Sequence, residues 1–185
     1  MSDPKDSIEI ENVVASTGIG QELDLQHVAM DLEGANYDPE QFPGLVYRTE
    51  NPKSAALIFR SGKIVCTGAK SPEAVRESLG IVFEKLRALD IPMDEDPEIT
   101  IQNIVTSADL GQALNLNAIA IGLGLENIEY EPEQFPGLVY RLDEPEVVAL
   151  LFGSGKLVIT GGKEPADAGR AVDVIMEELD GLGLM

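Results

Sequence analysis

Apolar and polar positions recur along this chain with two periods, one typical of strands and one typical of helices. Residues 8–16 and 99–107 are rich in Ile and Val and predict strands. Residues 45–49, 55–59 and 63–67 predict shorter strands, and Ser61-Gly62 is a natural tight turn between the last two. The pattern therefore predicts an antiparallel meander.

Helical spacing appears twice in each half of the chain. A short helix is predicted in each half by one apolar stripe: Leu25, Val28, Ala29 and Leu32, then Leu116, Ile119, Ala120 and Leu123. A longer helix follows each meander; Ser71 can cap the first, Pro72 suits its first turn, and Pro165 opens the second. The stripes predicted to be buried are Val75, Leu79, Val82, Phe83 and Leu86, then Ala168, Ala171, Val172, Ile175 and Leu179.

The two halves are copies of one unit. Residues 8–90 align with residues 99–183, first at an offset of 91 and then, after a two-residue insertion, at an offset of 93. The sequence PEQFPGLVYR occupies residues 39–48 and recurs unchanged at residues 132–141. Since only two copies exist, the chain is a pseudo-dimer rather than a solenoid. We expect a first repeat at 1–93 and a second at 94–185, joined by the acidic linker 94–97.

One face of the predicted sheet lacks the polar side chains that solvent requires. Ile64 and Cys66 should point to one side of their strand and Val65 and Thr67 to the other, so neither side is charged. Helices can cover one face only. The other apolar face therefore predicts a ligand surface or a dimer interface.

Composition removes several classes of protein. With 44% apolar residues the 185-residue chain can close a core. No apolar run approaches the roughly 20 residues of a membrane span, and no secretory signal begins the chain, so we expect a soluble protein in the cytoplasm. Cys66 and His27 are each the only one of their kind, which excludes disulfides and Cys/His zinc sites within one chain. No cofactor is expected.

The charge argues at first against nucleic acid, because the formal net charge is −20. Either the protein is an acidic partner-binding module, or its solvent face is adapted to a salt-rich cytoplasm. Many acids fall on the outward faces of the predicted helices, for instance Glu73, Glu77, Asp173, Glu177 and Glu178. This position favours the halophilic surface.

The matched Phe-Pro-Gly-Leu-Val-Tyr-Arg segments, Phe-x-Ser-Gly-Lys turns and Thr-Gly-x-Lys segments resemble the TATA-binding protein family, archaeal type, over nearly the whole chain. The resemblance implies an α+β fold: a two-fold pseudo-symmetric saddle with a curved antiparallel sheet of about ten strands and four helices on its convex face. It also implies a general transcription initiation factor, not an enzyme, that binds the minor groove of a TATA box and nucleates the preinitiation complex. The protein would then be associated with the nucleoid.

Two phenylalanines in each repeat match the family's wedges, which insert between base steps and kink the duplex. They are Phe42 and Phe59 in the first repeat and Phe135 and Phe152 in the second. The wedging mechanism comes with the resemblance, since this family is itself the standard example of it. Four of the five Phe residues fall at these repeat-matched places beside turns, where core packing alone would not concentrate them.

The resemblance places base contacts in the middle of the sheet. Asn12 and Asn103 match the pair that hydrogen-bonds the groove floor, with Thr67 and Thr160 as neighbours. Around them the apolar floor would comprise Val14, Val65, Val105, Val158, Leu57 and Leu150. The amino group of guanine would be buried there without a partner, so an A·T preference follows.

Six of the thirteen basic residues are repeat-matched and predict phosphate contacts. They are Arg48, Lys63 and Lys70 in the first repeat and Arg141, Lys156 and Lys163 in the second. Arg60 is matched by Gly153 and is the weaker candidate. Glu131 and Glu133 match the loop by which the family engages transcription factor B. Their twins, Asp38 and Glu40, carry the same charge, so charge alone does not explain a preference for one end.

The sequence also allows two other interpretations of function. An enzyme is disfavoured because the sequence has no phosphate-binding loop, no G-x-G-x-x-G and no His-based site. An acidic interaction module that dimerises through the apolar sheet would share the fold, but it gives the six matched basic residues no role. The expected partners are A·T-rich double-stranded DNA, transcription factor B and RNA polymerase, with no membrane. A homodimer off DNA stays open.

Overall fold

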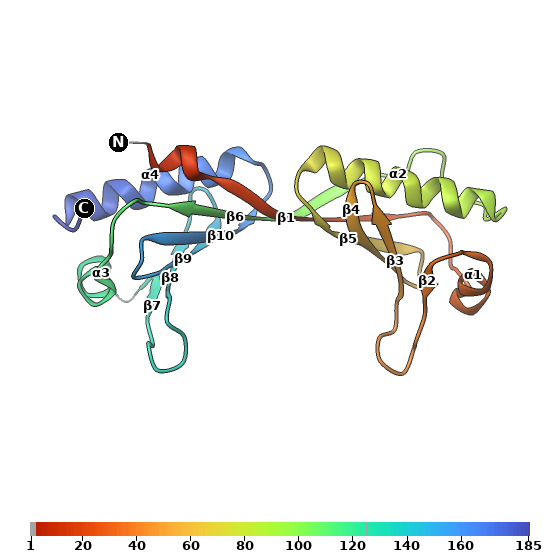
Figure 1. Ribbon diagram of the computed structural model, residues 1–185, viewed down its shortest axis with the longest axis horizontal. Helices are drawn as coiled ribbons and strands as arrows, with labels where there is room; N and C mark the ends of the chain where they lie inside the picture. Colours follow the sequence, from red (N-terminus) through yellow and green to blue (C-terminus); the bar gives the residue numbers. More distant parts are fainter. Residues whose placement is uncertain (1–2, 125) are drawn as a thin grey trace. The chain divides into compact units, whose positions relative to one another are not determined.

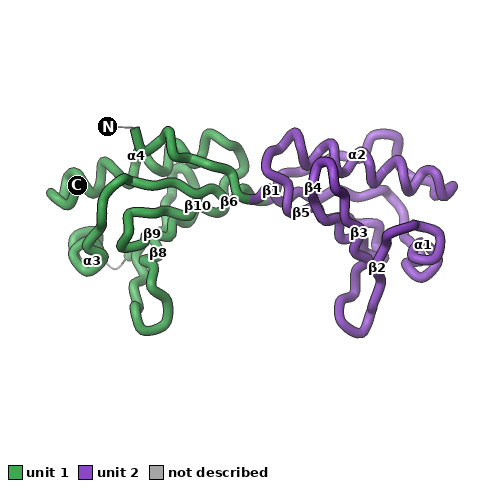
Figure 2. The backbone as a smooth tube through the Cα atoms, viewed as in Figure 1, with its two compact units in different colours: residues 1–11, 103–185 green, residues 12–102 purple. Residues whose placement is uncertain are grey.

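The computed structural model describes residues 3–124 and 126–185, which form two compact units (Figure 2). Unit 1 comprises residues 1–11 and 103–185, and unit 2 comprises residues 12–102. The chain therefore crosses from unit 1 to unit 2 inside its first long strand and returns inside its second. The division into repeats at residue 93 stays a prediction, since a repeat and a compact unit need not coincide.

Unit 2 contains two helices and five antiparallel strands in the order β2-β3-β4-β5-β1 (Figure 1). In chain order its elements are β1 (Glu9–Gly18), α1 (Leu25–Asp31), β2 (Ala35–Asn36), β3 (Leu45–Glu50), β4 (Lys53–Ile58), β5 (Lys63–Ala69) and α2 (Pro72–Ala88). The first three residues of β1 belong to unit 1. Helix α2 packs against β4 and β5.

Unit 1 repeats this arrangement with the strand order β7-β8-β9-β10-β6. Its elements are the short 3-10 helix η1 (Pro4–Ser7), then β6 (Thr100–Asp109), α3 (Leu116–Leu123), β7 (Ile128–Glu129), β8 (Leu138–Leu142), β9 (Val147–Leu151), β10 (Lys156–Gly162) and α4 (Ala166–Gly181). Residues 100–102 of β6 belong to unit 2. Helix α4 packs against β9, β10 and η1.

The long helices begin with different devices. The Ser71 hydroxyl accepts a hydrogen bond from the backbone N–H of Ala74 at 3.0 Å and caps α2, as its sequence predicts. Pro165 stands at the N-cap of α4, where no side chain makes a capping bond. Both predicted apolar stripes are buried, so the helical periodicity is confirmed.

The core of each unit lies between its long helix and one face of its sheet. Strand residues on that face are fully buried; they include Ile58, Ile64 and Cys66 in unit 2 and Leu151, Leu157 and Ile159 in unit 1. Their neighbours in sequence point to the opposite face; they are half-buried, except for Lys63 and Lys156, which are exposed. We call the face away from the long helix the open face.

The five strands whose bounds the sequence predicts, residues 8–16, 45–49, 55–59, 63–67 and 99–107, agree with β1, β3, β4, β5 and β6 to within two residues at each end, which is the usual uncertainty of strand ends. The described residues contain four α-helices and ten antiparallel strands, in agreement with the α+β class expected. Strands β2 and β7 are only two residues long and have no pattern of their own. Within the described residues, no helix has the length and apolar character needed to cross a membrane.

Candidate nucleic-acid interface

The open face of each unit is a half-buried apolar floor. Cross-strand partners share a face, so the register defines a row in each unit. In unit 2 the row is Val46, Leu57, Val65 and Ser16; in unit 1 it is Val139, Leu150, Val158 and Ser107. Val14 and Val105 are also half-buried on β1 and β6. The six predicted apolar floor residues are therefore exposed in part, as a contact surface requires.

An asparagine amide is held in one orientation at the edge of each floor. In unit 2 the Asn12 Oδ1 accepts a hydrogen bond from Gly68 N at 2.7 Å, and Asn12 Nδ2 donates to Thr67 Oγ1 at 3.1 Å. In unit 1 Asn103 makes the same bonds to Gly161 N at 2.6 Å and to Thr160 Oγ1 at 2.9 Å. Because a backbone N–H can meet only the amide oxygen, these bonds fix which end of each amide is the donor.

The irregular ladder beside each asparagine explains these bonds. The register of β1 with β5 shifts between Val13 and Ala15, and that of β10 with β6 shifts between Ile159 and Gly162. Gly68 and Gly161 adopt positive φ angles of 94° and 98° at these shifts, a conformation that favours glycine. Their N–H groups leave the ladder and donate to the asparagine side chains, so each asparagine also has a structural role.

The four predicted wedges form two edge-to-face ring pairs. The centroids of Phe42 and Phe59 are 5.8 Å apart, and those of Phe135 and Phe152 are 5.9 Å apart. All four rings are partly exposed, and Phe135 is 38% exposed, which is rare for a core aromatic. The sequence thus brings together in space two residues of each repeat that lie 17 positions apart.

A glycine lies directly beneath each ring pair. A Cβ on Gly44 would lie 2.8 Å from Phe42 and 3.0 Å from Phe59, and a Cβ on Gly137 would lie 2.7 Å from Phe135 and 3.0 Å from Phe152. These distances are shorter than van der Waals contact, so any larger residue would displace the rings. The glycine of each Phe-Pro-Gly segment therefore supports the phenylalanine ring of the same segment, and we call Gly44 and Gly137 the glycine platforms.

The predicted phosphate contacts lie on or beside the open faces. In unit 2 Arg48 pairs with Ala55, and Ala55 pairs with Thr67, so the three side chains form one cross-strand row. The matched row of unit 1 consists of Arg141, Val148 and Thr160. Lys63 and Lys156 begin β5 and β10 with the parity of Val65 and Val158, so they share the open face. Lys70 and Lys163 directly follow these strands and are exposed.

Two surface hollows of unit 1 bring predicted contact residues together. Phe152, Lys156 and Val158 line one hollow with Ser107 and Asp109. Arg141 and Lys163 line another with Val148 and Gly161. The second hollow also contains the carboxylates of Asp143, Glu146 and Asp167, so its two cations do not stand in a purely positive environment.

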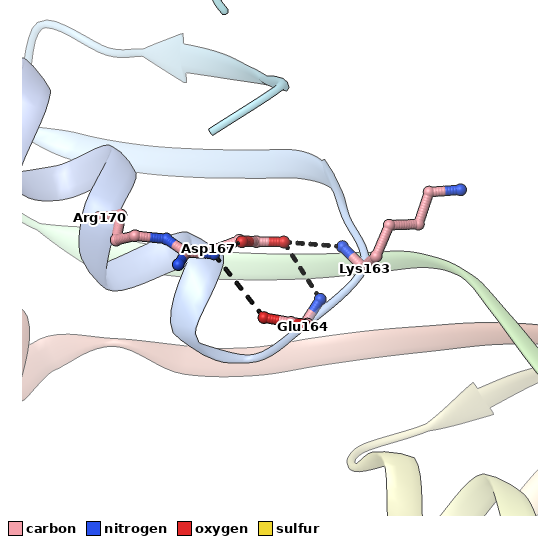
Figure 3. Close-up of polar contacts among 4 residues, drawn as sticks. All are labelled: Lys163, Glu164, Asp167 and Arg170. Carbon is pink, nitrogen blue, oxygen red and sulfur yellow. Dashed lines mark hydrogen bonds and ion pairs between the residues drawn. The ribbon is translucent and has the colours of Figure 1, made fainter. Parts of the chain in front are cut away.

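The Asp167 carboxylate stabilises the turn that carries Lys163 (Figure 3). Asp167 Oδ2 accepts hydrogen bonds from Lys163 N at 2.9 Å and Glu164 N at 3.1 Å, and Arg170 pairs with the other oxygen. Burial raises the pKa of Asp167, but the hydrogen bonds and the Arg170 charge outweigh it and leave the pKa below its usual value. The Lys163 side chain extends away from this cluster, with its ammonium free to reach outward.

Glu131 and Glu133 lie on the exposed loop between β7 and β8, which extends away from the rest of unit 1 (Figure 1). The Glu131 carbonyl accepts hydrogen bonds from Gln134 N and Phe135 N, so the loop that presents these acids also orients a wedge residue. Asp38 and Glu40 lie on the matched loop of unit 2, where Asp38 O accepts from Gln41 N and Phe42 N. The two loops are alike in backbone as well as in charge.

The remaining candidate residues fall into three groups. The five helix acids named above are exposed, as predicted for a solvated surface. Arg60 is exposed beside Tyr37, Glu22 and Asp24. Cys66 is fully buried, and burial raises the pKa of its thiol despite a hydrogen bond with Ser54. Among residues 3–124 and 126–185, no group of His, Cys, Asp and Glu could hold a metal ion.

Three residues of this interface escape reasoning from sequence. Glu129 forms an ion pair with Arg141, Asp167 fastens the Lys163 turn, and Gly137 supports a ring pair. The recurrence of Phe-Pro-Gly in both repeats is a signal that could have identified Gly137. The two carboxylates had no such signal, because the first repeat has Asn36 and Ala74 at their places.

Comparison with known proteins agrees with this geometry. The family model described as "Transcription factor TFIID (or TATA-binding protein, TBP)" matches residues 7–89 and 98–182. The chain is 83% identical to TATA-box-binding protein 1 of Haloferax volcanii, with 100% of this chain and 98% of that protein covered. It is 81% identical to TATA-box-binding protein E of Halobacterium salinarum, with both chains covered completely.

A solved structure supports the fold. Methanococcus jannaschii TBP aligns with a TM-score of 0.83 at 56% sequence identity, and the alignment covers 95% of this chain and 99% of that one. At that identity and coverage the likeness confirms the predicted fold class and extends over both repeats.

Proposed function

The chain belongs to the TATA-binding protein family, in its halophilic archaeal branch, and from this premise we propose that its open faces bind and kink the minor groove of A·T-rich promoters. Members of the family are DNA-binding transcription factors. The observation that carries the proposal is the pair of oriented amides, one on the half-buried apolar floor of each unit.

Each amide has one donor left for DNA. Asn12 Oδ1 is taken by Gly68 N–H, and one hydrogen of Nδ2 is directed to Thr67 Oγ1. The second hydrogen has no acceptor among the described residues. Adenine N3 and thymine O2 are acceptors on the groove floor, whereas guanine adds an amino donor there. At a G·C pair the asparagine N–H would face the guanine amino group, so two donors would meet beside the valines and neither would have a partner. The site should therefore prefer A·T pairs.

The ring pairs supply the kink. Insertion of apolar side chains between base steps is the known mechanism of this family, and Phe42, Phe59, Phe135 and Phe152 match the residues that insert. The exposure of these rings and their glycine platforms support it, because a ring held upright on a platform can enter a stack without first rearranging. Arg48, Lys63, Lys70, Arg141, Lys156 and Lys163 would then grip the phosphates on both sides.

The bent complex would recruit transcription factor B through Glu131 and Glu133, and RNA polymerase after it. The supporting observation is that both acids are exposed on a loop that extends from unit 1, where a partner can reach them while DNA occupies the open face.

The amide assignment is tested by replacing both asparagines with aspartate. Asp keeps an oxygen for Gly68 N–H and Gly161 N–H but offers acceptors, not donors, to the groove. We expect the Asn12→Asp/Asn103→Asp variant to lose at least about tenfold in affinity for a fluorescent A·T-rich duplex. Asn117→Asp, on the exposed side of α3, adds a charge away from the sheet and serves as control.

Thermal unfolding of each variant should be recorded beside the titration, since the asparagines also bond to the backbone. Loss of affinity without loss of folding supports the assignment. Unchanged A·T binding by the folded double variant, or equal binding of A·T-rich and G·C-rich duplexes by the parent, would refute it.

A further inference from the structure

We propose that Glu129 restrains Arg141 at low salt and so makes the phosphate grip of unit 1 weaker than that of unit 2. The inference rests on the proposed function, in which Arg141 and Arg48 are repeat-matched phosphate contacts. It concerns a positioning residue: Glu129 acts on DNA binding through the arginine beside it.

The ion pair lies on the open face itself. Glu129 stands opposite Val139 in the pairing of β7 with β8, and Arg141 is two residues further along β8. A diagonal neighbour of this kind shares the same face and is within reach of a long side chain. Arg141 Nη2 lies 3.5 Å from Glu129 Oε1, with the two side chains 57% and 68% exposed. The carboxylate therefore lies on the same face as the guanidinium and already binds the group that the proposed function assigns to a phosphate.

Unit 2 has no such restraint. Asn36 stands opposite Val46 in the matched pairing of β2 with β3, and Arg48 is again two residues further along. Asn36 is neutral, so it cannot form an ion pair that competes with a phosphate for the guanidinium. Within residues 3–124 and 126–185, Arg48 makes no ion pair.

The charge balance of the two units points the same way. Residues 12–102 carry 15 acidic and eight basic side chains, a formal net charge of −7. The residues of unit 1 carry 18 acidic and five basic side chains, a formal net charge of −13. Unit 1 therefore repels DNA more strongly, and a carboxylate placed directly on its open face adds to that difference.

The restraint should depend on salt. An exposed ion pair is weak, so its competition with a phosphate changes affinity by only about twofold to fivefold. Its range shrinks as the Debye length falls from about 10 Å at 0.1 M to about 3 Å at 1 M ionic strength. Glu129 should therefore weaken DNA binding at low salt and lose its influence near molar salt.

The test exchanges the matched residues. Glu129→Asn makes unit 1 like unit 2, and Asn36→Glu makes unit 2 like unit 1. Each variant is titrated with the same A·T-rich duplex from about 0.1 M to about 2 M KCl. At the lowest salt we expect Glu129→Asn to bind about twofold to fivefold more tightly than the parent, and Asn36→Glu to bind more weakly by a similar factor. Both differences should disappear at the highest salt.

A double-mutant cycle separates restraint from general charge. If Glu129 acts through Arg141, Glu129→Asn gives no gain in an Arg141→Gln background, and Asn36→Glu has little effect in an Arg48→Gln background. Glu177→Gln, on the outer face of α4, removes one acidic charge away from the sheet and is the control. A gain that persists in Arg141→Gln, equals that of the control, or is constant in salt would overturn the proposal. Failure of the parent to prefer A·T DNA would instead refute the proposed function.

Discussion

Beneath the open face of unit 2 lies a buried cluster of hydroxyl groups, whereas aliphatic side chains fill the matched positions of unit 1. Thr49 Oγ1 lies 2.6 Å from Ser54 Oγ, 2.6 Å from the Pro52 carbonyl oxygen and 3.5 Å from Ser78 Oγ. Their counterparts in the second repeat are Leu142, Val147 and Ala171, and Cys66 is matched by Ile159. The floor above is nearly the same in both units.

The difference shows which side of the sheet is constrained. Buried positions have diverged between polar and apolar solutions that each fill the space, since a hydrogen-bonded hydroxyl cluster and an aliphatic cluster can both close a core. The exposed positions Phe42, Asn12 and Arg48 have identical counterparts at the matched places. A surface that is half exposed yet unchanged between repeats is best explained by a ligand with two similar halves.

The largest expected difference between the units concerns transcription factor B. Replacing Glu131 and Glu133 with Arg should abolish the ternary complex with transcription factor B and A·T-rich DNA, because two charges on the loop that we propose as the contact are reversed. The twin variant Asp38→Arg/Glu40→Arg should retain it. Gel-shift titration of each variant, with and without transcription factor B, measures both effects. Equal loss in both variants would show that partner recognition does not distinguish the units.

The wedges give the next largest effect, and here the units should behave alike. Replacing Phe135 and Phe152 with Ala should remove the kink at one end of the site, and replacing Phe42 and Phe59 should remove the other. Energy transfer between labelled duplex ends measures the bend. Each double variant is expected to bend DNA less and to bind at least about tenfold more weakly, since two buried aromatic contacts are lost. A double variant that bends DNA like the parent would contradict the wedge assignment.

The buried hydroxyl cluster of unit 2 should tolerate replacement of all its members better than the loss of one member. In unit 2, Thr49→Val leaves buried hydroxyl and carbonyl groups without their partner and should cost about 1–3 kcal/mol of unfolding free energy. Replacing the three hydroxyl residues together, as Thr49→Val/Ser54→Ala/Ser78→Ala, removes the mutually bonded hydroxyls without adding side-chain volume, so this variant should be no less stable than Thr49→Val. Urea denaturation tests this; a triple variant less stable than Thr49→Val would show that the hydroxyl cluster cannot be replaced.

The smallest expected effect is on the pH dependence of the stability, and it arises from Asp167 at the start of α4. The folded pKa of Asp167 is lowered, so its contribution to stability is present above the unfolded pKa of about 3.9 and is lost as pH falls through the folded value. Asp167→Asn should therefore flatten the fall in urea midpoint between neutral pH and about pH 3. Ser71 caps α2 without titrating, so Ser71→Asp should steepen the same curve. Identical curves for all three proteins would exclude this role of Asp167.

Much of the fold follows from sequence because its signals are local. The alternation of Ile64 to Thr67 predicts both a strand and an uncovered apolar face, and the structure confirms both. Strands β2 and β7 could not be located in this way, since two-residue strands depend on their pairing with β3 and β8. The residues that make up unit 1 could not be predicted either, because residues 1–11 join it through contacts with residues more than 90 positions later in the chain. One such contact is that of Ser7 with Asp109.

The predicted contact residues lie where the repeats agree, but agreement is not sufficient: Gly137 recurs as Gly44 and is still missed, because its role depends on the packing of two rings above it. Matching Phe42 with Phe135 marks both rings before any coordinate is known. Glu129 and Asp167 have no acidic counterpart in the first repeat, so comparison of the two repeats does not identify them. Their roles depend on distances across strands and turns, namely Glu129 to Arg141 and Asp167 to Lys163. The contact residues themselves stay predictions until DNA binding is measured.

The way the chain crosses between units makes each repeat unable to complete its own unit. Residues 94–102 come before the second repeat's part of unit 1 yet belong to unit 2, where Asp94 N bonds to Ile19 O and Arg87 bonds to the carbonyls of Asp94 and Glu95. Residues 1–11 in turn belong to unit 1, where Lys5 pairs with Asp173. A chain cut between residues 93 and 94 would give two fragments that each carry a segment the other lacks. This protein is therefore a natural substrate for fragment complementation, in which neither half is expected to fold fully alone and both fold when mixed.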